Sequence, residues 1–90
     1  LRWAAPERMI AGVKPTSAAD VYSVGLVLLE MLSGRVPYHG IDGAALISAI
    51  SKSPPAVSAD VDKFCSDLMH QCWNQDPAGR PSASSLLQLI

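Results

Sequence analysis

The most apolar stretch of the chain is residues 18–33, AADVYSVGLVLLEMLS, and apolar residues occupy nearly all of its positions. A helix that is apolar on almost every side is typical of a protein interior. At about 100° per residue, Asp20, Ser23 and Glu30 fall on one narrow stripe of such a helix. We therefore predict a buried helix over residues 18–33 whose polar side chains need partners along one side, because an unpaired buried carboxylate is costly.

Residues at both ends of this stretch favour a helix of that length. Thr16 or Ser17 can cap its first turn, and Ser17 with Asp20 three positions later resembles a capping box with the shorter acid. Gly34 can adopt the left-handed conformation that ends many helices, and Pro37 prevents continuation. The pattern therefore predicts a helix that begins near Thr16 and ends at Gly34.

The rest of the chain also shows helical patterns. We predict a short helix over residues 6–10, where Pro6 suits a first helical position, and a helix over residues 43–51 capped by Asp42. The clearest amphipathic pattern covers residues 59–74, and a last helix runs from Pro81 to Ile90. No strand pattern of useful length and no internal repeat is present, so we predict an all-α fold. The predicted apolar face of residues 59–74 consists of Val61, Phe64, Cys65, Leu68, Met69, Cys72 and Trp73.

Composition indicates that the chain is part of something larger. Of its 90 residues, 49% are hydrophobic, and the mean hydropathy is +0.22. A domain of this size has much surface and little interior, so it cannot easily enclose a central apolar helix. The chain also opens on Leu1-Arg2-Trp3 rather than on Met. We therefore expect a piece of a longer protein that buries the central helix with other segments.

Charge excludes several classes of partner. The net charge is −1, and no basic run suits nucleic acid or an anionic membrane surface.

A membrane span would need about 20 apolar residues, whereas the uninterrupted part of the central stretch is residues 25–29. Cys65, His70 and Cys72 lack a fourth metal ligand, so core packing explains the two cysteines better than a metal site. We expect no metal site, and reduced thiols in a cytosolic or nuclear protein.

Three sequence blocks, read in order, resemble parts of a protein kinase catalytic domain. Residues 3–8, WAAPER, are similar to the A-P-E motif that closes the activation segment. Residues 17–30 resemble the buried helix F of that family, and residues 72–81, CWNQDPAGRP, resemble the segment before its last helix. The resemblance covers nearly the whole chain and points to the tyrosine kinase and tyrosine-kinase-like branch. It implies the helical C-terminal subdomain of the large lobe, built around the buried helix.

The resemblance also assigns roles to residues. Glu7 and Arg80 would form a buried ion pair, although lone charges are more often solvated. Asp20 would accept hydrogen bonds from the backbone of the catalytic loop. Without the resemblance, Asp20 is interpreted as an acidic residue that the helix dipole favours at a helix start. The resemblance further implies that Val27 and Met31 support a hydrophobic column, and that a peptide-substrate groove is lined by Arg2, Trp3, Ala4, Ala5 and Glu30.

The parts that carry out phosphoryl transfer are missing from this chain. Its six glycines form no GxGxxG motif, and neither H-R-D nor D-F-G occurs. The resemblance therefore implies ATP and Mg²⁺ for a parent protein, no cofactor and no catalytic residue in this chain, and an inactive fragment when alone. We expect it to be the scaffold and substrate-side portion of a kinase. Ser/Thr is slightly favoured over Tyr as the side chain that the parent phosphorylates.

The expected partners are the remainder of the kinase domain and, in the parent, a protein substrate. The parent would lie in the cytoplasm or on the cytoplasmic side of a receptor. The alternative is a non-catalytic helical interaction module, either a pseudokinase or a truncated product. A third class is an unrelated helical bundle.

Overall fold

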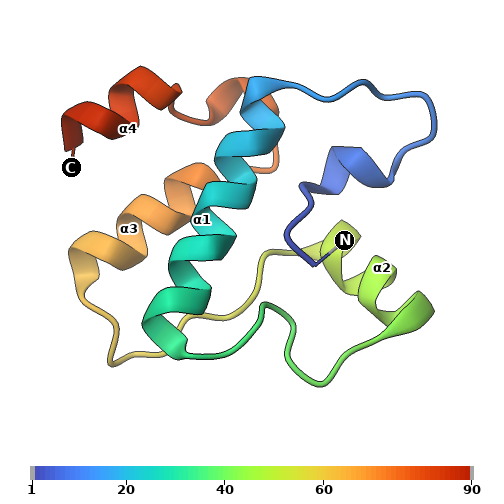
Figure 1. The fold of residues 1–90 in the computed structure, drawn as a ribbon, viewed down its shortest axis with the longest axis horizontal. Coiled ribbons are helices and arrows are strands. Elements are labelled where there is room, and N and C mark those ends of the chain that lie inside the picture. Colours follow the sequence, from blue (N-terminus) through green and yellow to red (C-terminus); the bar gives the residue numbers. More distant parts are fainter. Residues whose placement is uncertain (1, 90) are drawn as a thin grey trace.

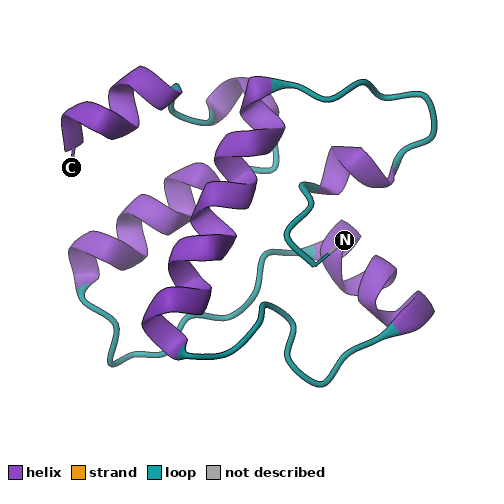
Figure 2. Ribbon diagram, viewed as in Figure 1, coloured by secondary structure: helices purple, strands orange, loops and turns teal. Residues whose placement is uncertain are grey.

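The computed structural model describes residues 2–89, and every regular element among them is helical (Figures 1 and 2). The all-α prediction is therefore confirmed. Helix α1 crosses the molecule, with α3 and α4 on one side and η1 and α2 on the other (Figure 1). Ile90, where we predicted the last helix to end, lies outside the described residues. The elements are η1 (Pro6–Met9), α1 (Ser17–Ser33), α2 (Gly43–Lys52), α3 (Lys63–Cys72), η2 (Pro77–Gly79) and α4 (Ala83–Leu89).

The ends of α1 follow from local side-chain and backbone chemistry. Thr16 is the N-cap, and its Oγ1 accepts a hydrogen bond of 3.1 Å from the backbone N–H of Ala19. Thr16 rather than Ser17 therefore caps the helix, without the capping box that Ser17 and Asp20 suggested. Gly34 ends α1 with a φ of 73°, in the left-handed region that suits a residue without a Cβ. The predicted helix is thus present, one residue longer at its start.

The hydrophobic core lies between α1 and α3, which pack against each other. Gly25 makes this close approach possible, since a Cβ at this position would lie 2.7 Å from Nε1 of Trp73 and 2.9 Å from Cβ of Cys72. Tyr22, Leu26 and other α1 residues on the same face are buried with them. Helix α2 packs separately, against η1.

Further local predictions differ from the structure, and one of them is the start of α4, which begins at Ala83 rather than at Pro81. Helix α3 begins at Lys63 rather than at residue 59, because a turn precedes it in which the N–H of Val61 donates to the carbonyl of Ser58 at 3.1 Å. Phe64 in its first turn is exposed, contrary to the predicted core position. Asp42 is at the N-cap position of α2, but its side chain makes no capping hydrogen bond because it pairs with Arg2 instead.

The shape of the chain explains how far α1 is buried. The backbone extends 34 × 28 × 16 Å, and a helix with its side chains is about 10 Å thick. Along this shortest dimension, the other helices can therefore cover only one of the two faces of α1. Val24, Val27 and Met31 on its other side are 53%, 46% and 76% exposed. The chain is too short to supply a second covering layer. The expectation that other segments of a longer protein bury this face of α1 stays a prediction.

Candidate functional site

Arg80 joins the start of the chain to the segment before α4. Its Nη1 and Nη2 donate to the two carboxylate oxygens of Glu7, at 2.6 and 2.8 Å, and the arginine side chain is fully buried. The same guanidinium donates to the carbonyls of Ala18 and Asn74, at 3.0 and 2.8 Å, and stacks 4.7 Å over the ring of Tyr22. The hydrogen bonds from Arg80 lower the pKa of the Glu7 carboxyl, which keeps it ionised.

Residues 2–5, which we call the N-terminal segment, lie beside α1. The side chain of Trp3 donates from Nε1 to Oε1 of Glu30 at 2.8 Å, and its backbone carbonyl accepts from Oγ of Ser23. Arg2 donates to the carbonyls of Pro37 and Tyr38, at 3.3 and 2.9 Å. The N-terminal segment is thus fixed on one side to α1 and on the other to the loop before α2, where Arg2 also pairs with Asp42.

Asp20 differs from the other two members of the predicted polar stripe. Ser23 and Glu30 both bond to Trp3, whereas Asp20 is exposed, and no residue from 2 to 89 bonds to its carboxylate. At about 100° per residue, Asp20 shares its face of α1 with Val24, Val27 and Met31. We call these four residues the open face. It combines one carboxylate with a row of exposed apolar side chains.

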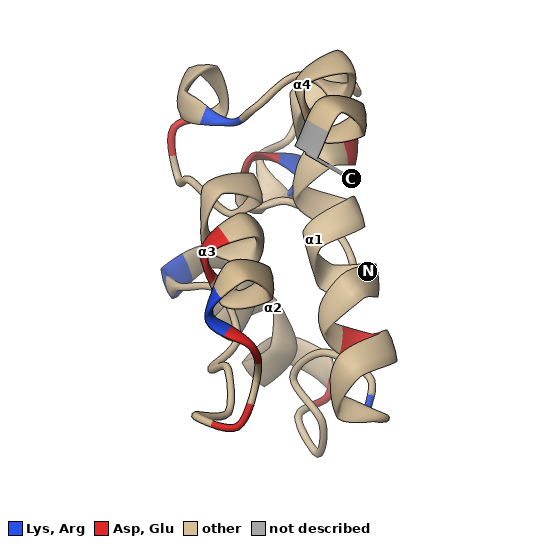
Figure 3. Ribbon diagram, turned by 90° about the vertical axis from the view of Figure 1, so that its left-hand side faces the viewer, with Lys and Arg blue, Asp and Glu red and all other residues tan. Residues whose placement is uncertain are grey.

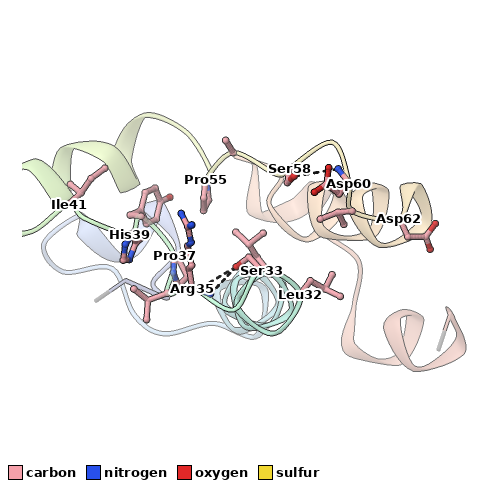
Figure 4. A pocket seen from close by; sticks show the side chains of 15 residues that line it. Leu32, Ser33, Arg35, Pro37, His39, Ile41, Pro55, Ser58, Asp60 and Asp62 are labelled. Carbon is pink, nitrogen blue, oxygen red and sulfur yellow. Dashed lines mark hydrogen bonds between the residues drawn. The ribbon is translucent and has the colours of Figure 1, made fainter.

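A pocket of about 900 Å³ lies at the C-terminal end of α1 (Figure 4). Its walls come from the end of α1, from the loop before α2, and from the linker over residues 55–62. Tyr38 braces it, since its hydroxyl donates to the carbonyl of Ser53 at 3.0 Å, and burial raises the pKa of that hydroxyl. The pocket involves neither the open face nor the N-terminal segment. Its lining includes Leu32, Ser33, Arg35, Pro37, His39, Ile41, Pro55, Ser58, Asp60 and Asp62.

Side chains that could ligate a metal do not cluster in the described part of the chain. No group of three or more His, Cys, Asp and Glu side chains within residues 2–89 could hold a metal ion. Basic and acidic positions are scattered over the helices and loops in Figure 3. Burial raises the pKa of the Cys72 thiol, as expected for a core cysteine. No helix within residues 2–89 is long and apolar enough to span a membrane.

Comparison with known proteins identifies the family. A family model described as protein tyrosine and serine/threonine kinase matches residues 1–90. The chain is 39% identical over 90 residues to human mitogen-activated protein kinase kinase kinase 11, and 36% identical over 88 residues to dual specificity protein kinase pyk3 of Dictyostelium discoideum. These alignments cover 98% and 96% of this chain but 10% and 6% of the relatives. The chain belongs to the protein kinase family, as its sequence motifs predicted.

A plant protein shows the same relationship. The chain is 32% identical over 92 residues to mitogen-activated protein kinase kinase kinase 5 of Arabidopsis thaliana, which covers 96% of this chain and 13% of that protein. The chain thus spans only a small fraction of the length of the curated relatives it matches.

Sequence reasoning placed the N-terminal segment and α1 in the same region but missed the bonds between them. The polar stripe showed that Ser23 and Glu30 needed partners, but helical periodicity says nothing of which distant residue faces the stripe. Trp3 was a visible signal, because an indole N–H needs an acceptor when it is buried. Arg2 and Asp42 gave no such signal, since exposed charges are common and seldom paired.

Proposed function

We propose that residues 1–90 are the scaffold and substrate-side portion of the large lobe of a protein kinase. This portion lacks the N-lobe, the catalytic loop and the D-F-G motif of the complete kinase domain. The parent protein would transfer the γ-phosphate of ATP, with Mg²⁺, to protein side chains. The names of the relatives, which include serine/threonine and dual specificity kinases, favour Ser/Thr over Tyr as the acceptor. The fragment alone would be inactive, and the parent would act in the cytoplasm or at the cytoplasmic side of a receptor.

The observation that carries this proposal is the open face. A row of exposed apolar side chains is unfavourable on a finished surface, but it suits a surface that another part of the protein covers. Asp20 would accept backbone hydrogen bonds from the catalytic loop, and Val27 and Met31 would support the hydrophobic column. The remainder of the kinase domain is the partner that fits the open face.

The N-terminal segment supports the substrate-side part of the proposal. Its backbone is held at Trp3 by Ser23, and Arg2 bonds to two carbonyls of the loop before α2. A segment fixed from two sides can present a constant surface to a peptide. Arg2, Trp3, Ala4 and Glu30 would line that groove, and a protein substrate would be the partner there. Ala5 was assigned to the groove as well, but it is fully buried in the core and would support the groove from beneath.

This assignment defines what the chain contributes to the reaction. Catalysis of phosphoryl transfer depends almost entirely on positioning and on electrostatic stabilisation. ATP and Mg²⁺ would supply the phosphoryl group and its charge neutralisation, and the residues that bind them lie outside this chain. The residues described here would keep the catalytic loop and the peptide in register, so their loss should lower the rate without removing a reacting group.

A phosphotransfer assay on the full-length parent tests the proposal. Wild type, with ATP, Mg²⁺ and a generic protein substrate, should incorporate phosphate, and a variant of the catalytic-loop aspartate should not. Asp20→Asn should lower the rate by about 10- to 100-fold, because the side chain loses its charge and one of its two acceptor oxygens becomes an NH2 donor, which misplaces the loop. Asp60→Asn, an exposed acid in the linker before α3, is the matched control and should leave the rate unchanged.

The opposite result is also defined. A folded parent that transfers no phosphate to any substrate would contradict the enzymatic part of the proposal. That result would favour the alternative function, a non-catalytic interaction module such as a pseudokinase. Equal rates for wild type and Asp20→Asn would remove the anchor role from Asp20.

A further inference from the structure

Among the serines and threonines of the chain, only Ser53 is followed by a proline. Pro54 and Pro55 come directly after it, and residues 53–58 have no regular secondary structure. The backbone at Ser53 is extended, with a φ of −164° and a ψ of 157°, which is the conformation that a following proline favours. Because proline has no N–H, the peptide bond after Ser53 carries no hydrogen-bond donor. The chain thus presents a hydroxyl on an extended segment at the end of α2.

The hydroxyl of Ser53 is accessible and uncommitted. Ser53 is exposed, and no residue from 2 to 89 hydrogen-bonds to its Oγ. The hydroxyl of Ser58 in the same linker differs, because its Oγ accepts from the backbone N–H of Asp60 at 3.4 Å. A second pocket, of about 470 Å³, adjoins Ser53 and has Tyr38 and Lys52 in its lining. Space for a group added to Ser53 is therefore present.

We propose that Ser53 is a phosphorylation site for a Ser/Thr protein kinase that selects proline after the acceptor, and that the phosphate loosens the end of α2. An apolar subsite accepts such a proline, because no N–H is left unpaired there. Oγ of Ser53 forms a bond to the γ-phosphorus of ATP, and the bond from that phosphorus to the oxygen of ADP breaks. The hydroxyl proton passes to a carboxylate of the acting kinase. The inference does not rest on the proposed function, because Ser53 is the acceptor and the enzyme is another protein.

The effect on α2 follows from the position of Ser53 at its C-terminal end. The N–H of Ser53 donates to the carbonyl of Ala49 at 3.3 Å, and its carbonyl accepts from the hydroxyl of Tyr38 at 3.0 Å. A phosphate carries a charge of about −1.5 to −2 at pH 7, which is unfavourable beside the negative end of a helix. Lys52 in the last turn offsets part of this charge, but exposed pairs contribute little. Phosphorylation should therefore weaken the last turn of α2.

Phosphorylation of the full-length parent tests whether the fold presents Ser53. The parent carries a variant catalytic-loop aspartate, so that it cannot phosphorylate itself, and is mixed with ATP, Mg²⁺ and a purified kinase that requires proline after the acceptor. A peptide of residues 49–58 is treated in parallel. Mass spectrometry should place phosphate on Ser53 at a rate within about tenfold of the peptide rate, because the fold need not open. A lower rate would show that the fold hides Ser53, and would overturn the inference.

The selectivity of the site has two controls. Ser51 is also exposed, but it lies within α2 and is followed by Lys52, so it should stay unmodified, and Ser53→Ala should remove the phosphate. A purified kinase that requires basic residues before the acceptor should leave Ser53 unmodified. Equal phosphate on Ser51 and Ser53, or faster modification of Ser53 by this second kinase, would contradict the inference.

Hydrogen exchange of the parent measures what the phosphate does to α2. Amides of residues 49–53 should exchange about two- to fivefold faster after phosphorylation, whereas the amides of α3 should be unaffected. Ser53→Ala, treated with the same kinase, should show no change in either helix. Unchanged exchange of residues 49–53 in the phosphorylated parent would overturn the inferred effect on α2. Neither measurement needs activity of the parent, so an inactive parent would contradict only the proposed function.

Discussion

Arg80 donates two hydrogen bonds to Glu7 across 73 positions of the chain, and its side chain is completely buried while that of Glu7 is 16% exposed. A buried guanidinium is tolerated only where its donors are satisfied. Here the carbonyls of Ala18 and Asn74 take the donors that Glu7 does not. Three segments therefore meet at one side chain, which ties η1 and α1 to the turn over residues 74–80.

Loss of Arg80 should destabilise the parent domain more than loss of Glu7. Arg80→Leu removes all four hydrogen bonds and leaves Glu7 without its partner, so the free energy of unfolding should fall by about 3–5 kcal/mol. Glu7→Gln keeps an acceptor oxygen and should cost about 1–3 kcal/mol. Urea unfolding measures both. Asp67→Asn, which breaks an exposed pair with Lys63, is the control and should leave the midpoint unchanged; an equal effect of Asp67→Asn would contradict the account.

The Glu7 carboxyl should make stability depend on pH in the acidic range. Its folded-state pKa is lowered from 4.5 by the hydrogen bonds from Arg80, so the unfolded state binds the proton more readily. The stabilisation is complete above the unfolded pKa and is lost as pH falls through the folded one. Unfolding free energies of wild type should therefore fall between about pH 5 and pH 3 more steeply than those of Glu7→Gln. Parallel curves would be inconsistent with this.

Gly25→Ala should destabilise the packing of α1 on α3. A helix interior normally gains about 1 kcal/mol from this change, but the added Cβ would lie 2.7 Å from Nε1 of Trp73 and 2.9 Å from Cβ of Cys72. Both neighbours are buried, so relief requires the helices to separate, at a net cost of about 1–3 kcal/mol. Thermal unfolding of the parent measures the cost. Gly25→Ala in a Trp73→Phe background should cost less, and a stabilising Gly25→Ala would contradict this packing.

The 90-residue chain expressed alone should not melt as a stable monomer. Val24, Val27, Met31 and Leu32 leave apolar surface on α1 uncovered, and such patches promote self-association or loose packing. We expect binding of an apolar fluorescent dye and a broad thermal transition by calorimetry. A sharp two-state transition of a monomer would show that these residues form an independent domain.

The sequence predicted elements better than it predicted contacts. Apolar periodicity located α1, and Gly34 located its end, because both depend on residues within a few positions. The start of α3 was misplaced because Ser58 and Val61 form a turn that continues the apolar spacing without being helical. Phe64 was assigned to the core because periodicity identifies a face but not whether a neighbour covers it.

The site shows the same division between local and distant information. Asp20, Ser23 and Glu30 were recognised as a stripe from helix geometry alone. The pairing of Glu7 with Arg80 came from the family resemblance, because no local pattern links residues so far apart. The bond between Trp3 and Glu30 was not predicted, although the resemblance assigned both to a substrate groove. Which distant residues come into contact depends on how the chain folds back on itself. The spacing of residues along the sequence does not predict this.

The central claim is that the rest of a kinase catalytic domain covers the open face of α1. Hydroxyl-radical footprinting of the folded parent tests it directly, because methionine oxidation follows solvent exposure. Met31 is 76% exposed in this chain, whereas Met69 is fully buried and serves as the internal reference. If the account is right, Met31 in the parent is oxidised as slowly as Met69. Oxidation of Met31 many times faster than Met69 would show that the open face stays bare, and would contradict the account.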